Sequence, residues 1–235
     1  CKQDYSDFLK FHKEKNAEFS VAVMEVPWED ASRFGLMVAD DDDKITEFQE
    51  KPKNPKSNLA SMGIYIFNWD ILKKYLIEDE NDPDSENDFG NNIIPNLLRD
   101  DRRMYAYHFN GYWKDVGTLG SYWEANMELI DLIPEFNLYE EYWKIYTKSE
   151  IQPPDYISAD SVVERSIIGE GSEVYGEVYN SVIGCGVTIG KGTVIRDSII
   201  MNQTQIGEGC EINKAIIAEN VVVGNQVKLG VGEEA

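Results

Sequence analysis

Aliphatic residues recur at a fixed interval toward the end of the chain. The steps between successive positions are 6, 6 and 5 residues, and each group of three returns after 17 residues. Glycine follows the aliphatic residue at five of these positions. Apolar residues repeat every 3.6 residues in an amphipathic helix and every 2 in a strand, so this spacing fits neither. The positions are Ile183, Ile189, Ile195, Ile200, Ile206, Ile212, Ile217, Val223 and Leu229.

A six-residue period is typical of a parallel β-helix with three short strands in each coil. The aliphatic residue points into the core, and glycine or a small polar residue turns each corner. We expect this part to act as a rigid spacer or an assembly surface. A hexapeptide acyltransferase is the alternative, but it usually relies on a histidine base. The two histidines, His12 and His108, both precede the repeat, which disfavours acyl transfer.

The formal net charge of -21 limits the partners of this chain. Nucleic acids and anionic membrane surfaces both attract basic proteins, so we expect neither as a partner. No apolar run approaches the roughly 20 residues that a membrane span requires. Three cysteines, Cys1, Cys185 and Cys210, lie at no metal-ligand spacing, and this odd number favours a reducing cytoplasm.

The first half alternates between strand and helix patterns, which predicts an α/β layered domain. Ser6 and Thr118 are the expected N-terminal caps of two helices, and Asn16 is the expected stop of the first. The acidic run 40–43 is interpreted as a solvated hairpin turn, with a divalent-ion site as the alternative. Helices are predicted over 6–16, 69–78 and 118–130, and strands over 19–26, 34–39, 45–50, 61–67 and 104–109.

Glu50 and Lys51 stand at a predicted strand end, just before Pro52. Adjacent strand residues point to opposite faces, so we expect the two side chains to do separate work. A carboxylate accepts hydrogen bonds from sugar hydroxyls, and an ammonium neutralises a phosphate. On the next strand, Ser61 offers a hydroxyl to a ligand, and Gly35 offers a backbone N–H. Taken alone, these residues also fit an ordinary polar strand edge.

Asp115 precedes a glycine turn and a predicted helix start. A carboxylate at such a position is suited to hold Mg²⁺, which in turn binds phosphate oxygens. The alternative is that Asp115 only caps the next helix, although Thr118 already fits that role.

Taken in order, these clusters resemble the bacterial ADP-glucose pyrophosphorylases, also called glucose-1-phosphate adenylyltransferases. The resemblance runs essentially from one end of the chain to the other. The motifs are Phe48–Pro52, Ser61–Phe67, Asp88–Gly90, Tyr112–Thr118, Pro134–Tyr139 and Ile145–Thr147, followed by the repeat.

The resemblance implies a partial Rossmann-like nucleotidyltransferase domain over 1–131, a connecting segment over 132–158, and a left-handed parallel β-helix of hexapeptide repeats over 159–235. That family makes ADP-glucose and pyrophosphate from ATP and glucose 1-phosphate with Mg²⁺, in glycogen biosynthesis. Its members are allosteric enzymes, and the resemblance implies a homotetramer.

By the same resemblance, Lys51 and Asp115 are catalytic. Lys51 would contact the sugar phosphate, and Asp115 would bind the metal. The implied binding residues for glucose 1-phosphate are Gly35, Glu50, Lys51, Ser61, Tyr65, Asp88, Phe89 and Trp113.

The family also carries an N-terminal glycine-rich nucleotide loop and a second metal-binding Asp, and neither is in this sequence. The chain starts without Met and stops at Gly230–Ala235, inside the repeat pattern, so we expect the carboxy-terminal two-thirds of a longer enzyme. As it stands, such a portion would bind ATP poorly and would not catalyse. A non-catalytic regulatory or assembly subunit, and a transferase for another sugar or base, are the remaining alternatives.

Overall fold

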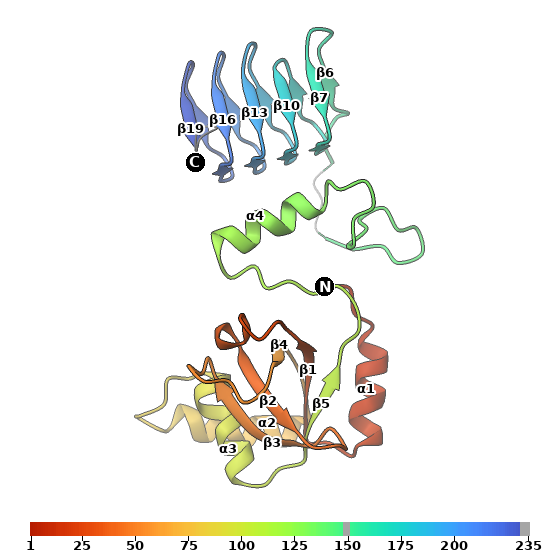
Figure 1. Cartoon of the computed structure of the whole chain (residues 1–235), viewed down its shortest axis with the longest axis vertical. Helices are drawn as coiled ribbons and strands as arrows, with labels where there is room; N and C mark the ends of the chain where they lie inside the picture. The colour runs from red at the N-terminus through yellow and green to blue at the C-terminus, as the bar shows by residue number, and fades with distance from the viewer. Residues whose placement is uncertain (148–150, 231–235) are drawn as a thin grey trace. The chain divides into compact units, whose positions relative to one another are not determined.

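The computed structural model describes residues 1–147 and 151–230. Contacts within the chain divide it into two compact units, one ending at Trp113 and the other beginning at Lys114. Each unit is coloured by residue number in Figure 1. The expected domain division after residue 131 and the expected connecting segment over 132–158 remain predictions. None of the helices in the described ranges is long and apolar enough to cross a membrane.

The first unit is built on a five-stranded mixed sheet with the order β3-β2-β4-β1-β5 (Figure 1). β4 runs antiparallel to both of its neighbours, β1 and β2, whereas β5 runs parallel to β1. All the predicted strands and helices of this unit are present, with ends within a couple of residues of those expected. The strands are β1 (Phe19–Glu25), β2 (Gly35–Ala39), β3 (Ile45–Glu50), β4 (Leu59–Phe67) and β5 (Met104–His108). The helices are α1 (Tyr5–Glu14), η1 (Ala31–Arg33), α2 (Trp69–Glu80), η2 (Phe89–Ile93) and α3 (Ile94–Arg99).

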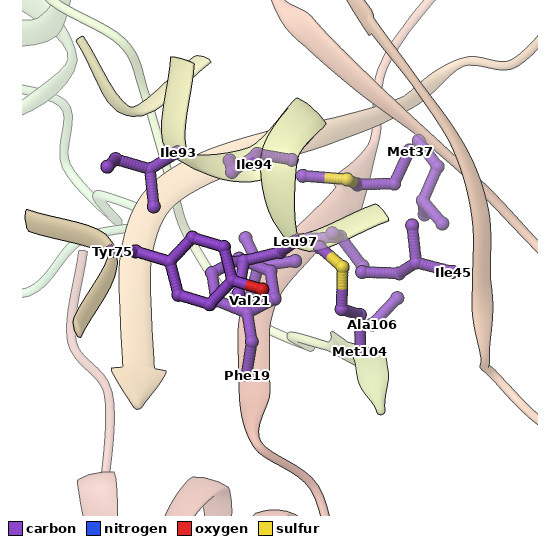
Figure 2. Close-up of a cluster of buried hydrophobic side chains, with 12 residues drawn as sticks. Phe19, Val21, Met37, Ile45, Tyr75, Ile93, Ile94, Leu97, Met104 and Ala106 are labelled. Atoms are coloured by element: carbon purple, nitrogen blue, oxygen red, sulfur yellow. The ribbon is translucent and has the colours of Figure 1, made fainter. Parts of the chain in front are cut away.

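The two faces of this sheet carry separate apolar clusters. Alternate residues of β4 point to opposite faces, so Tyr65 and Phe67 join one cluster while Ile64 and Ile66 join the other. Figure 2 shows the first cluster, in which the Tyr75 ring of α2 lies among side chains of the sheet and of α3. The buried members of that cluster are Phe19, Val21, Val23, Met37, Ile45, Leu59, Tyr75, Ile93, Ile94, Leu97, Met104 and Ala106.

The ends of the first helix differ from the prediction in one respect. Asp4, and not Ser6, is the N-cap of α1, because the Asp4 carboxylate accepts the backbone N–H of Ser6 at 2.8 Å. The predicted stop at Asn16 is confirmed, since this residue follows the C-cap and has a φ of 47°.

The segment comprising η2 and α3 was not predicted as helical. η2 is a π-helical turn, which has no recognisable apolar period. Pro95 follows at the start of α3, where the missing N–H is tolerated because the first helical N–H groups have no intrahelical partner.

The acidic run is a turn, as expected. Asp40 Oδ1 accepts the backbone N–H groups of Asp42 and Lys44, both at 2.9 Å. Lys15 Nζ lies 2.8 Å from Asp42 Oδ1, so part of the negative charge is paired. The same turn covers the outer edge of β5, where Asp43 O accepts the backbone N–H of Ala106 at 2.9 Å.

A polar network ties α2 to the chain that follows α3. The Tyr75 hydroxyl donates to Asp100 Oδ2 at 2.5 Å and accepts from Arg102 Nε at 3.1 Å. This hydrogen bond is the main reason that the pKa of Asp100 lies below its ordinary value of 3.8. Burial raises the pKa of Tyr75, so its hydroxyl remains the donor at neutral pH.

Removing this donor is expected to make stability less dependent on acid. The folded-state pKa of Asp100 is depressed, so its contribution is present above pH 3.8 and is lost as the pH falls through the folded value. Tyr75→Phe should therefore lower the free energy of unfolding at pH 7 and pH 5, and the difference from wild type should shrink below pH 3.8. Urea unfolding at several pH values measures this. Tyr142→Phe, at a side chain 98% exposed, is the control, and a difference that does not vary with pH would contradict the assignment.

The second unit contains α4 (Leu119–Glu128) and a stack of short strands. Thr118 caps α4, as predicted: its hydroxyl oxygen accepts the backbone N–H of Ser121 at 3.1 Å, and the Ser121 hydroxyl oxygen accepts the backbone N–H of Thr118 in return. The Trp123 indole N–H of α4 donates to Asp197 O, a carbonyl of the strand stack, at 2.7 Å. α4 is therefore fastened to the stack within this unit.

The predicted parallel β-helix is confirmed, with three sheets that follow its three sides. Each strand pairs with the one 17 residues further on, as Ile183 pairs with Ile200 and Ile200 with Ile217. Eight of the nine predicted core positions are buried, whereas Leu229 is 38% exposed on the outermost described strand, β19. The part of the repeat over 231–235 lies outside the described residues.

The first paired strand of the stack, β6, begins at Tyr156. The first side of the stack holds β6 (Tyr156–Ile157), β9 (Glu173–Val174), β12 (Thr188–Ile189), β15 (Gln205–Ile206) and β18 (Val222–Val223). The second holds β7 (Val162–Glu164), β10 (Glu177–Tyr179), β13 (Val194–Arg196), β16 (Glu211–Asn213) and β19 (Lys228–Gly230). The third holds β8 (Ile167–Ile168), β11 (Val182–Ile183), β14 (Ile199–Ile200) and β17 (Ile216–Ile217).

Buried hydroxyls connect successive coils at one corner. Ser198 Oγ donates to Arg196 O at 2.6 Å and accepts the backbone N–H of Ala215, in the next coil, at 3.1 Å. Ser181 Oγ accepts the backbone N–H of Ser198 in the same way. Each hydroxyl therefore satisfies one group in its own coil and one in the coil above.

Ser198→Ala is expected to lower the free energy of unfolding by about 1–3 kcal/mol, because the buried N–H of Ala215 loses its acceptor. Chemical denaturation followed by circular dichroism measures the change. Gln205→Ala, on the exposed side of β15, is the control and should stay within about 0.5 kcal/mol of wild type. Equal stabilities of the two variants would show that the hydroxyl column contributes nothing.

Candidate functional site

A pocket of about 200 Å³ opens in the first unit, between strands β2, β3 and β4 and the turn η2. Six of the residues predicted to bind substrate line it together. The lining also includes Phe48, Gly63 and Gly90, which were not assigned to the site from the sequence. The full lining is Gly35, Phe48, Glu50, Ser61, Gly63, Tyr65, Asp88, Phe89 and Gly90.

Strand pairing and alternation bring these residues together. Gly35 of β2 and Glu50 of β3 are direct partners in the antiparallel ladder. Ser61, Gly63 and Tyr65 follow one another on a single face of β4, because alternate strand residues share a face. Gly63 has a φ of 70°, a left-handed conformation that disfavours other residues, and its N–H donates to Ser61 Oγ at 3.2 Å.

Aromatic rings form one wall of the pocket. The Tyr65 and Phe89 rings stack with centroids 5.6 Å apart and planes 19° from parallel. Burial raises the pKa of Tyr65, and the negative charges of Glu50 and Asp88 raise it further, against a hydrogen bond with Ser61 that lowers it. The Tyr65 hydroxyl is therefore protonated at neutral pH and is available as a donor.

Two carboxylates, Glu50 and Asp88, face the pocket. Asp88 is the N-cap of η2, and its Oδ1 accepts the backbone N–H of Asn91 at 2.8 Å. Ionised carboxylates only accept hydrogen bonds, so this pair suits a ligand rich in hydroxyl donors. A phosphate placed directly between them would be repelled, and its partner must be a cation at the rim.

Lys51 supplies a cation next to the pocket. Its Nζ lies 3.6 Å from Glu50 Oε1, and its side chain is 67% exposed. The expectation that Glu50 and Lys51 point to opposite faces of a strand is wrong, because β3 ends at Glu50 and Lys51 adopts a left-handed φ of 41°. Such a conformation costs a non-glycine residue about 1–2 kcal/mol, and it turns Lys51 toward the Glu50 carboxylate.

Trp113 lies elsewhere in the first unit. Its ring packs against Phe34 at 5.6 Å between centroids, and it belongs to the apolar clusters that hold Leu36 and Met62. Because Met62 and Tyr65 point to opposite faces of β4, Trp113 packs on the face away from the pocket. A role for Trp113 in substrate binding remains a prediction.

Asp115 belongs to the second unit, just before α4. Its Oδ1 accepts the backbone N–H of Gly117 at 3.2 Å, and a Cβ on Gly117 would lie 3.2 Å from Asp115 Oδ2, so glycine leaves the carboxylate uncrowded. Thr118, and not Asp115, caps the helix. Across the ranges 1–147 and 151–230, no group of three or more His, Cys, Asp or Glu side chains is arranged to hold a metal ion.

Lys114, beside Asp115, is bound to α4. Its Nζ lies 2.5 Å from Glu128 Oε1 and 3.2 Å from Glu124 Oε2. These ion pairs hold the segment that carries Asp115 against the helix. The sequence gave no signal for them, because Lys114 and Glu128 are 14 positions apart along the chain.

Comparison with known families agrees with the fold and the pocket. The nucleotidyl transferase family matches residues 1–131, and the GlmU-like C-terminal hexapeptide family matches residues 155–235. The chain belongs to the nucleotidyl transferase family.

Curated relatives named glucose-1-phosphate adenylyltransferase are similar to the chain over most of its length. A protein of Lachnospira eligens is 61% identical over 80% of this chain, and one of Acetivibrio thermocellus is 53% identical over 99%. A protein of Thermotoga neapolitana is 55% identical, also over 99%. The matched regions cover 44%, 54% and 55% of those relatives, so the chain spans about half of their length and not the expected two-thirds.

Proposed function

We propose that this chain forms the sugar-phosphate-binding part of a glucose-1-phosphate adenylyltransferase, which makes ADP-glucose and pyrophosphate from ATP and glucose 1-phosphate. One observation carries the proposal: two carboxylates, a serine and a stacked aromatic pair converge in one pocket beside an exposed lysine. The names of the similar proteins supply the choice of glucose and adenine.

Each pocket group has a role in binding a sugar phosphate. Glu50 and Asp88 accept hydrogen bonds from sugar hydroxyls, and the Tyr65 hydroxyl donates one. The Tyr65 and Phe89 rings provide an apolar wall for the ring carbons of the sugar. Lys51 neutralises the phosphate at the rim, where the two carboxylates do not crowd it.

In the proposed reaction, a phosphate oxygen of glucose 1-phosphate attacks the α-phosphorus of ATP, and pyrophosphate leaves. No covalent enzyme intermediate is required, so the chain contributes by orienting the sugar phosphate in line and by neutralising its charge. Asp115 fits a divalent cation such as Mg²⁺, which takes oxygen ligands and is commonly held by one or two carboxylates together with substrate phosphates. When bound, such a cation neutralises charge on the phosphate oxygens.

The finer assignments follow from the same resemblance. We propose that the enzyme serves glycogen biosynthesis in the cytoplasm as an allosteric homotetramer. The acidic charge and the buried, regular β-helix support an assembly built from protein surfaces, with no part for nucleic acid or membrane.

The test is an assay of the full-length protein with purified substrates. ADP-glucose and pyrophosphate should form in equal amounts from ATP and glucose 1-phosphate, with Mg²⁺ present. Parallel reactions should replace glucose 1-phosphate by galactose 1-phosphate or N-acetylglucosamine 1-phosphate, and ATP by UTP, CTP or GTP. Preference for another sugar or base would overturn the substrate assignment, and no product from any pair would overturn the enzymatic one.

A further inference from the structure

The Glu50 carboxylate lies between two glycines that come from separate segments. A Cβ atom built on Gly90, in η2, would lie 2.6 Å from Glu50 Oε2. A Cβ atom built on Gly35, in β2, would lie 2.9 Å from the same oxygen. Both separations are shorter than a carbon and an oxygen tolerate without moving, so side chains at these positions would displace the carboxylate.

The backbone does not require glycine at either position. Neither Gly35 nor Gly90 adopts the left-handed conformation that favours glycine, in contrast to Gly63 with its φ of 70°. Alanine therefore fits the backbone at residue 90, and what it would disturb is the pair of carboxylates. The same Cβ would lie 3.2 Å from Asp88 Oδ1.

Steric confinement holds the Glu50 side chain where hydrogen bonds do not. Within residues 1–147 and 151–230, the carboxylate is paired with Lys51 at 3.6 Å and accepts no side-chain or backbone hydrogen bond. Its lone pairs thus stay available for a ligand, while the two glycines fix the place that the oxygens occupy. A group oriented by contact and not by its own hydrogen bonds is ready to bind without first exchanging partners.

We propose that Gly90, together with Gly35, is a positioning residue that seats the Glu50 carboxylate and thereby sets the selectivity of the pocket for sugar hydroxyls. This inference rests on the proposed function, since it assumes that the pocket binds the sugar of a sugar 1-phosphate. A site built to accept a hydroxyl rejects an analogue that lacks it, because the buried acceptor is then left unpaired. A displaced carboxylate loses this discrimination.

Gly90→Ala is expected to weaken binding of glucose 1-phosphate by about 10- to 100-fold, the range for losing one or two hydrogen bonds to a charged group. Calorimetry with the full-length protein measures the Kd directly, without reference to turnover. Steady-state rates should show the same increase in KM for glucose 1-phosphate, with the KM for ATP changed by less than about 2-fold. Gly120→Ala, in the uncrowded first turn of α4, is the matched control.

A double-mutant cycle with Glu50→Ala distinguishes positioning from a general effect on folding. Glu50→Ala removes the carboxylate that the new methyl group would meet, so Gly90→Ala should weaken binding by less than about 2-fold in that background. If Gly90→Ala alone unfolds the protein, Glu50→Ala should restore folding by relieving the clash. Additive losses, failure of this rescue, or a Kd of Gly90→Ala equal to that of wild type would overturn the inference.

The proposed function and this inference fail in different ways. Wild-type protein that binds glucose 1-phosphate without forming a sugar nucleotide would sink the proposed reaction, and the cycle measured by Kd would still test the glycines. Wild-type activity on glucose 1-phosphate together with an additive cycle would uphold the reaction and reject the role of Gly90.

Discussion

Replacing Lys51 by alanine in the full-length protein is expected to raise the KM for glucose 1-phosphate by about 10- to 100-fold. Lys51 is the cation next to a pocket that otherwise presents two carboxylates, and a hydrogen bond to a charged group contributes about 1.5–3 kcal/mol. Without the ammonium, the phosphate would face the negative charge of Glu50. The KM for ATP should change much less, so initial rates with each substrate varied in turn measure the effect.

Two further variants sharpen this test. Lys53→Ala removes an exposed charge two residues away and should leave both KM values within about 2-fold of wild type. Lys51→Arg keeps the charge but changes its shape, and it should recover part of the loss. An unchanged KM in Lys51→Ala would remove Lys51 from the site, and an equal loss in Lys53→Ala would reduce the effect to net charge.

Asp115→Asn is expected to lower kcat by about 10²–10³-fold, the range seen when one group that stabilises transition-state charge is removed. The amide keeps the size of the side chain and can still accept the N–H of Gly117, so α4 and its cap at Thr118 should remain. The lost charge should weaken the divalent cation that the carboxylate is proposed to hold. Two measurements are needed: kcat at saturating substrates, and binding of Mn²⁺ followed by electron paramagnetic resonance.

Asp155→Asn, an exposed carboxylate before β6, is the control for charge alone. If Asp115→Asn binds Mn²⁺ as wild type does and retains its kcat, Asp115 has no metal role. If Mn²⁺ binding weakens while kcat is preserved, the cation is held there but is not required for the reaction.

The β-helix was predictable because each coil repeats the same instruction. A buried aliphatic residue recurs on every side, and the neighbouring coil presents the same residue 17 positions on, as with Ile183 and Ile200. The sheet of the first unit was also predictable, since alternation along β1 and β3 reflects burial on one face. η2 was missed because a π-helical turn has neither period, and α3 because Pro95 interrupts its pattern.

The site was predictable in its side chains but not in its geometry. Glu50, Ser61, Tyr65 and Asp88 carry chemistry that a sequence displays. Gly90 contributes by having no side chain, and that contribution exists only once the fold has brought Glu50 beside it. The direction of Lys51 was misjudged for a related reason, since a left-handed residue just after a strand reverses the usual alternation and no local pattern announces it.

The pairing of the β-helix also limits how the length of this region can change. Every strand from β6 to β18 is aligned with residues one full coil away, and the Ser181 and Ser198 hydroxyls link the same corner of successive coils. Deleting one residue within a coil would move each later aliphatic residue off its column and replace an inward side chain by an outward one. Removing a whole coil would leave all the remaining columns in register. The region is therefore quantised: insertions and deletions inside it are tolerated as whole coils, and single-residue changes are confined to its corners.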